Sequence, residues 1–144
     1  MSRREDIALN IVATIQGMSS PVSASFVTRD PFQVEELSNA QFPAVFIQTT
    51  DESRQDVTVG ADQIVREGVI SFDLIGYVKA NSIDTARNNL IEAIEEALDS
   101  DRTRNGKALD TQVVRIQTDE GSIAPIGGVI VSVEVMYTFV RGST

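Results

Sequence analysis

The residues best suited to chemistry in this sequence are carboxylates that gather in one short stretch. They are Glu92, Glu95, Glu96, Asp99 and Asp101. Spacings of three and four place the first four on one side of a helix. Such a set could hold a divalent cation, which prefers oxygen ligands. It is equally typical of a solvated helix face, and a third interpretation is a docking surface for a basic partner.

Two residue types that carry much enzyme chemistry are missing. The chain has no His and no Cys, which removes disulfides, thiolate zinc sites, cysteine nucleophiles and imidazole acid–base catalysis. Gly121, Gly127 and Gly128 fit no phosphate-binding motif, so we interpret them as hinge or turn glycines. No catalytic set can be assembled and no cofactor is indicated. The sequence therefore favours a protein that is not an enzyme.

Basic residues follow the carboxylates at once, in a loop that contains Asn105 and Gly106. They could neutralise the carboxylates locally, or they could reach the acidic helix of a neighbouring copy. Different patches that meet on identical subunits make a heterologous contact, which closes into a ring if the rotation allows. The predicted subunit interface consists of Glu92, Glu95, Glu96, Asp99, Arg102, Arg104 and Lys107.

Composition predicts one soluble domain over residues 1–144. Hydrophobic residues make up 42% and charged residues 23% of the chain, as is typical of globular proteins. No apolar run approaches the roughly 20 residues of a membrane helix, and no signal peptide is indicated, so we expect a protein made in the cytoplasm with no membrane partner. The net charge of −9 argues against specific binding of free DNA or RNA, which requires a basic face.

The secondary structure is organised around a strand, a turn and a helix between Val69 and Leu98. Ile70, Phe72 and Leu74 alternate with polar residues, as in a half-buried strand. Apolar residues from Ile83 onward recur at helical spacing instead. We expect this helix to bury its stripe against the even-numbered face of the strand.

The other segments predict one more helix and further strands. An apolar stripe begins at Ile7, after the capping candidates Ser2 and Asp6, and ends near Gly17. Strands are expected at 23–28, 44–49, 113–118 and 129–139. In the strand at 113–118 we expect Val114 and Ile116 to face one way and Arg115 the other. The order is α-β-β-β-α-β-β, which predicts an α+β fold: an antiparallel or mixed sheet with two helices on one face.

The segment from Asp51 to Glu67 is long for a connection between two strands. It is polar and has Gly60 near its centre. It could be a mobile surface loop, or a projecting hairpin that acts as a binding arm. The residues predicted to dock a partner are Asp51, Arg54, Asp56, Gly60, Asp62 and Arg66.

With this layout, the chain resembles the tail terminator proteins (minor tail or tail completion proteins) of long-tailed bacteriophages. The pattern spans nearly the whole chain. Its parts are the N-terminal helix, the strand from Phe42 to Phe46, the long polar connection, a strand ending at Gly76-Tyr77-Val78, a helix beginning near Asp84 and closing at Leu98, a charged loop to Gly106, and a last strand ending at Val135-Met136-Tyr137.

The resemblance implies a structural virion protein that forms a ring, commonly of six copies. Such a ring caps the tail tube, ends tail growth and offers a surface for joining the head. It implies the tail tube protein and neck or connector proteins as partners, and localisation in the virion after assembly in the host cytoplasm. DNA would only pass through an acidic lumen. The alternatives are another neck component, such as a stopper, a small α+β enzyme and a ligand-binding module.

Overall fold

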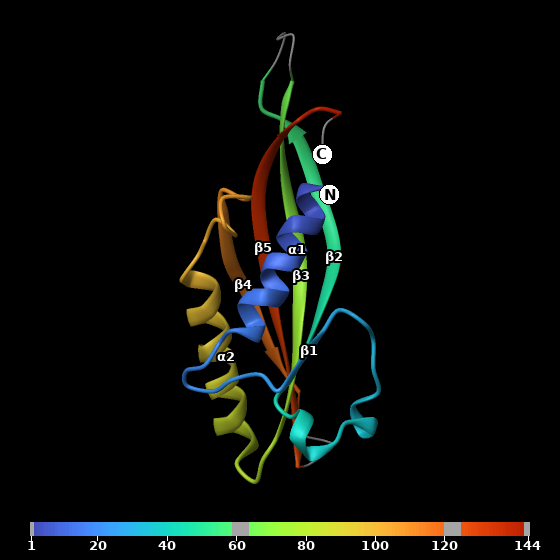
Figure 1. The fold of residues 1–144 in the computed structure, drawn as a ribbon, viewed down its shortest axis with the longest axis vertical. Coiled ribbons are helices and arrows are strands. Elements are labelled where there is room, and N and C mark those ends of the chain that lie inside the picture. Colours follow the sequence, from blue (N-terminus) through green and yellow to red (C-terminus); the bar gives the residue numbers. More distant parts are fainter. Residues whose placement is uncertain (1, 59–63, 120–124, 143–144) are drawn as a thin grey trace.

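A computed structural model describes residues 2–58, 64–119 and 125–142 of the chain. Its elements follow the predicted order α-β-β-β-α-β-β, with two short 3-10 turns, η1 and η2, between the first two strands (Figure 1). Their bounds are α1 Arg3–Gln16, β1 Phe26–Thr28, η1 Val34–Glu36, η2 Asn39–Gln41, β2 Ala44–Asp56, β3 Val65–Lys79, α2 Ile83–Asp99, β4 Asp110–Thr118 and β5 Ile126–Val140.

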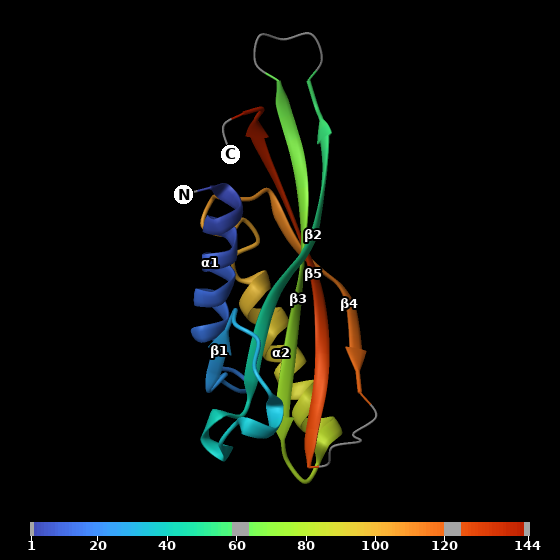
Figure 2. The same cartoon turned by 90° about the vertical axis from the view of Figure 1, so that its right-hand side faces the viewer.

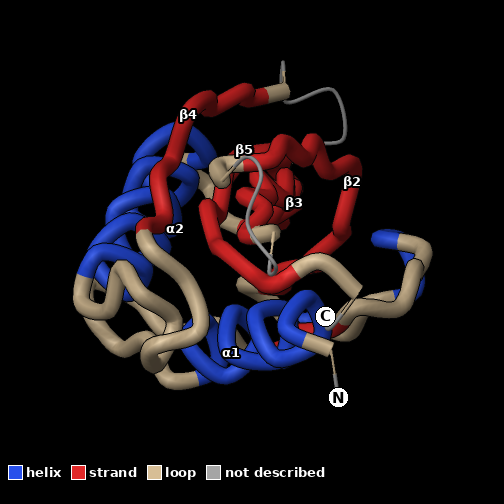
Figure 3. The backbone as a smooth tube through the Cα atoms, turned by 90° about the horizontal axis from the view of Figure 1, so that it is seen from above, coloured by secondary structure: helices blue, strands red, loops and turns tan. Residues whose placement is uncertain are grey.

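The five strands form one mixed sheet in the order β1-β2-β3-β5-β4. β1 runs parallel to β2, and every other neighbouring pair is antiparallel. Both helices lie on the same side of the sheet (Figure 2). Seen from above, the strands coil strongly while α1 and α2 follow one side (Figure 3). The predicted fold class is confirmed.

The sheet is centred on the pairing of β3 with β5. Their register is unbroken from Val65 opposite Val140 to Lys79 opposite Ile126. The even-numbered residues of β3 and the odd-numbered residues of β5 are buried beneath the helices, as the period of two predicts. The centre of the core is formed by Ile70, Phe72, Leu74, Val131, Val133 and Val135.

Each helix begins and ends for a local reason. The hydroxyl of Ser2 accepts a hydrogen bond from the backbone N–H of Glu5, which caps α1. α1 ends at Gly17, whose backbone N–H donates a hydrogen bond to the carbonyl of Ala13. α2 buries the stripe predicted from its spacing, so the helix covers the even-numbered face of β3 as expected. Its buried apolar members are Leu90, Ala93, Ile94 and Leu98.

The segment between the two central strands is largely strand rather than loop. β2 continues to Asp56 and β3 starts at Val65. The backbone N–H of Val57 still donates to the carbonyl of Val65, 2.8 Å away. This hairpin runs past the end of α1 (Figures 1 and 2). The interpretation as a projecting hairpin is therefore correct for its described part, whereas Gly60 and Asp62 lie outside the described residues.

One local prediction in the second half of the chain is wrong. Gly127 and Gly128 are not turn glycines but buried residues of β5. In β4, Arg115 and Ile116 pair with Ser132 and Val131 and so face opposite ways, as expected, but the register with β5 shifts between Val113 and Arg115. Such a bulge places one extra residue on the edge strand, and Val114 is that residue. Gly121 lies outside the described residues.

At Gly76, α2 lies too close to β3 for a side chain to fit. A Cβ at this position would lie 2.6 Å from Cδ2 of Leu90 and 3.2 Å from Cγ1 of Val129. Both contacts belong to core side chains that cannot move freely in a close-packed interior. Glycine is required here by packing rather than by a turn.

We predict that Gly76→Ala destabilises the fold by about 1–3 kcal/mol through overpacking. Urea unfolding followed by circular dichroism measures the loss. Gly17→Ala is the matched control, since its Cβ would meet nothing closer than 3.4 Å, and its effect should stay within about 0.5 kcal/mol. Equal stability of the two variants would contradict the close approach of α2 to β3.

Candidate functional site

The four predicted carboxylates of α2 form an acidic side on its C-terminal half. Glu92, Glu96 and Asp99 are exposed and Glu95 is half-buried. Within the described part of the chain none of them has a salt bridge or side-chain hydrogen bond to a cation. The described residues also contain no group of three carboxylates positioned to hold a metal ion. This surface, called here the acidic side of α2, is chemically suited to contact a cationic partner.

Arg104 does not belong to an exposed basic patch, contrary to the prediction. Its side chain is fully buried. The guanidinium donates to the backbone carbonyls of Leu98, at 2.6 Å, and of Asp101, and to the hydroxyl of Thr14 at 3.4 Å. It thereby satisfies the last carbonyl groups of α2 and ties that helix end to α1. Burial lowers the pKa of Arg104, and the nearby carboxylates of Asp101 and Asp99 partly counteract that effect.

The loop after α2 is shaped by its own polar contacts. Arg104 and Asn105 adopt the left-handed backbone conformation with φ of 50° and 59°. The carboxylate of Asp101 accepts hydrogen bonds from the backbone N–H groups of Thr103 and Asn105. Burial raises the pKa of Asp101, but these hydrogen bonds outweigh it and hold the pKa below its usual value. The loop is thus a fixed structure that presents its remaining cations outward.

Two cations of the predicted basic set remain at the surface. Arg102 is 68% exposed and its Nε lies 3.9 Å from Asp110. Lys107 is 47% exposed and its Nζ lies 4.0 Å from Asp6. Ion pairs this long and this exposed contribute little to stability. Arg102 and Lys107, called here the exposed basic pair, therefore remain able to contact another molecule.

The described residues of the predicted docking arm lie in paired strands. Asp56 and Arg66 face each other across the hairpin, and their side chains form a salt bridge of 2.8 Å. Asp51 is exposed, with no ion pair or side-chain hydrogen bond to another described residue. Arg54 turns toward the body of the molecule, where its guanidinium lies 4.7 Å from the ring centre of Phe139. The arm therefore has both outward charges and an anchored base.

Sequence reasoning missed the polar cluster at the base of this arm. The carboxylate of Glu52 accepts hydrogen bonds from Nε of Arg4 and Nε of Arg54, both at 2.5 Å, and from the hydroxyl of Tyr137 at 2.9 Å. Only 8% of the Glu52 side chain is exposed. The cluster joins α1, β2 and β5, and so fixes the direction in which the arm leaves the body.

Burial and hydrogen bonding have opposite effects on the pKa of Glu52. Burial raises the pKa of Glu52, but the hydrogen bonds from Arg54, Tyr137 and Arg4 outweigh it and lower the pKa overall. Burial and the hydrogen bond to Glu52 raise the pKa of Tyr137. Gly68 leaves space for the contact between Glu52 and Tyr137, because a Cβ at this position would lie 2.7 Å from the Tyr137 ring and 2.9 Å from Glu52. The arrangement is structural: it holds one ionised carboxylate in place.

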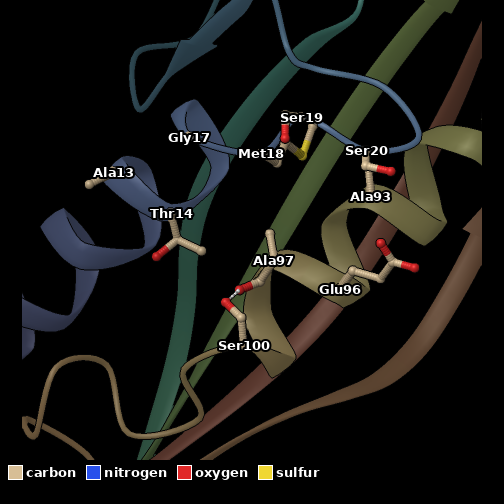
Figure 4. A pocket seen from close by; sticks show the side chains of 10 residues that line it. All are labelled: Ala13, Thr14, Gly17, Met18, Ser19, Ser20, Ala93, Glu96, Ala97 and Ser100. Carbon is tan, nitrogen blue, oxygen red and sulfur yellow. Dashed lines mark hydrogen bonds between the residues drawn. The ribbon is translucent and has the colours of Figure 1, made fainter.

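A groove of about 380 Å³ lies between the C-terminal ends of α1 and α2 (Figure 4). Its walls are mostly small side chains, including Ala13, Ala93 and Ala97, and Ser100 is occupied by a hydrogen bond to the carbonyl of Ala97. Glu96 is the one titratable group among its lining residues. The groove has no pair of groups that could exchange a proton with a substrate, so it supports no catalytic mechanism.

The fold itself has a counterpart among solved structures. A chain from a structure titled "Virion of native gene transfer agent (GTA) particle" superposes with a TM-score of 0.59 at 13% sequence identity. The match covers 92% of this chain and 96% of that one. No protein-family model matches the sequence, and no curated protein matches it either. In the described residues, no helix is long and apolar enough to cross a membrane.

We predict that Arg104→Ala destabilises the protein by about 2–4 kcal/mol, because it removes buried hydrogen bonds to the carbonyls of Leu98 and Asp101 and opens a cavity. Arg102→Ala, two residues away and exposed, should change the free energy of unfolding by no more than about 0.5 kcal/mol. Urea unfolding of both variants tests the assignment. Equally small losses of unfolding free energy in the two variants would contradict the burial of Arg104.

We predict a pH-dependent cost for Glu52→Gln. The lowered pKa of Glu52 means that its contribution is complete above the usual carboxyl pKa and is lost as the pH falls through the lowered value. The variant should lose about 1–3 kcal/mol near pH 7, and the difference from wild type should shrink as the pH falls below the usual carboxyl pKa. Urea unfolding across this range measures it, with Glu92→Gln as an exposed control. A deficit that is independent of pH would contradict an ionised Glu52.

Proposed function

We propose that this protein is a structural component of a phage-like virion. The observation that carries the proposal is the likeness to a virion chain across almost the full length of both molecules. The resemblance of the sequence to tail terminators points the same way, and it supports a finer assignment: a ring that caps the tail tube, ends tail growth and joins the tail to the head.

The surface chemistry supports assembly rather than catalysis. Among the described residues, no salt bridge engages the acidic side of α2, and the exposed basic pair is only weakly engaged. Charges left unpaired on a stable monomer are available to select and orient neighbouring subunits. We propose that both surfaces contact adjacent copies in a ring, with six copies as the expected number.

The arm is proposed to dock the tail tube protein or a neck component. Its base is fixed by Glu52, while Asp51 projects outward and the Asp56–Arg66 pair lies near its end. Six copies at −9 each would bring roughly 50 negative charges together. A ring so charged would let DNA pass without retaining it. If the ring binds the portal side rather than the tube, the protein is a stopper or connector component instead.

We predict that native mass spectrometry across a concentration series detects a closed oligomer, and that negative-stain images show a central hole. Double charge reversal at Arg102→Glu and Lys107→Glu should weaken this self-association by about tenfold or more, since like charges then meet. The circular dichroism spectrum should stay unchanged. Leu9→Gln, on the exposed side of α1, is a control that should assemble normally.

A compact monomer at every concentration, in the presence and absence of purified tail tubes, would overturn the ring. Normal assembly of the doubly reversed variant would remove the exposed basic pair from the interface. Rings that bind tail tubes would favour a tail terminator. Rings that bind only connector particles would favour a stopper or connector component.

A further inference from the structure

Among the described strands, β4 forms one edge of the sheet. It is paired on one side only, with β5. Its bulge residue Val114 is 49% exposed and Ile116 is 41% exposed. Ile116 is in register with buried Val131, so it lies on the helix-covered face but beyond the cover of α2. Unpaired backbone groups beside exposed β-branched side chains make a template for another strand.

The opposite side of the sheet has a second free edge, on β2. β1 pairs only with Ala44, Val45 and Phe46. Arg29, directly after β1, lines the same hollow as Thr49, and the chain then returns to the lower end, where the ring of Phe32 packs edge-on against Phe46 and Tyr77. From Ile47 to Asp56, β2 is paired with β3 alone among the described strands, and in Figure 1 the segment after β1 passes beside only its lower part.

These two edges are level with each other across the sheet. Ile47 is in register with Leu74, Leu74 with Val131, and Val131 with Ile116. At the other end, Ser53 connects through Val69 and Met136 to Asp110. The free parts 47–53 and 110–116 thus occupy the same height, each about 24 Å long.

The directions of the two strands also match. Three antiparallel steps separate β2 from β4, so the two strands run in opposite directions. When copies stand side by side around a rotation axis, all point the same way along it. The β4 edge of one copy then meets the β2 edge of the next in antiparallel orientation, which can form a ladder on either side of the two bulges.

The charges on the two edges are compatible with pairing of β4 with β2 of a neighbouring copy. Arg115 is exposed on β4 and Asp51 is exposed on β2, and neither has an ion pair or side-chain hydrogen bond to another described residue of its own chain. Bringing 110–116 beside 47–53 places this cation and this carboxylate in one seam, where they lie about 10 Å apart along the strands, because Arg115 is level with Gln48 and Asp51 with Gln112. Two β4 edges, by contrast, would bring Arg115 against Arg115, and like charges at close range disfavour that contact.

We propose that neighbouring copies join by strand addition, with β4 of one subunit extending the sheet of the next along the free edge of β2. This inference rests on the ring proposed above and names the surface that closes it. The bulge and the charges on both edges discourage indiscriminate pairing, while Val114 and Ile116 become covered only in the correct contact.

The absence of native cysteine permits a direct test. The hydroxyl of Thr50 donates to the carbonyl of Ser71 at 3.1 Å. Ser71 is in register with Glu134, and Glu134 with Gln112. Thr50 and Gln112 are therefore level on the two edges, and paired antiparallel strands bring Cα atoms to about 4.5–5.5 Å, within disulfide range.

Under mild oxidation, Thr50→Cys with Gln112→Cys in one chain should give a ladder of covalent oligomers up to the ring. On a denaturing gel without reductant, each single variant should run as a monomer, because its thiol faces no second thiol across the contact. Thr50→Cys with Leu9→Cys is the matched control and should give no ladder. The same gel measures wild-type cross-linking by a short amine-reactive reagent.

Substitutions on the edges provide the second measurement. Val114→Lys with Ile116→Lys should weaken assembly by about tenfold or more, with an unchanged circular dichroism spectrum. Arg115→Asp alone should also weaken it, because a cation in the seam is replaced by a carboxylate on the same side as Asp51 of the neighbouring copy. Leu9→Lys, equally exposed on α1, should assemble like wild type.

The results separate this inference from the ring itself. A ladder together with weakened assembly of the lysine variants supports strand addition. Wild-type rings with no ladder and with normal assembly of the lysine variants would overturn strand addition and leave the ring intact. A wild-type monomer under every condition, with no ladder, would overturn both.

Discussion

The antiparallel pairing of β3 with β5 is the constraint on which the rest of the molecule depends. Fifteen residues of each strand face one another without a shift. Because side chains alternate with a period of two, an unbroken register keeps one set of residues beneath the helices along the whole length. A slip by one residue would turn Phe72 and Leu74 outward together. Both helices, β2 and β4 are placed relative to this pair.

Irregularity is confined to the strands outside that pair. β2 shifts register between Thr49 and Glu52, and β4 shifts between Val113 and Arg115. Each shift changes which residues face the helices. On β2 the shift turns Glu52 inward, where it contacts Tyr137. On β4 it adds the exposed residue Val114 at the edge of the sheet. The central pair gives stability, while the outer strands carry the features that distinguish one surface from another.

The sequence predicted the regular parts of this fold because their periods are strong. Alternation in Val129–Phe139 and the helical spacing after Ile83 left little choice of structure. The burial of Arg104 was not predicted, because a basic residue in a charged loop usually remains in water and only the tertiary position of α1 gives it a place inside. The Glu52 cluster was missed for another reason. Even alternation from Val45 through Ile47 and Thr49 directs position 52 outward, and the bulge that reverses it leaves no clear mark in the sequence.

The continuity of the central strands has a mechanical consequence. β3 and β5 run from the helix-covered body into the base of the arm with no loop or hinge between them. A load applied to the arm along the strand direction would shear all the interstrand hydrogen bonds at once, rather than peel them apart one after another. The two halves of the molecule therefore act as a single stiff rod, through which tension or compression at one end is transmitted to the other.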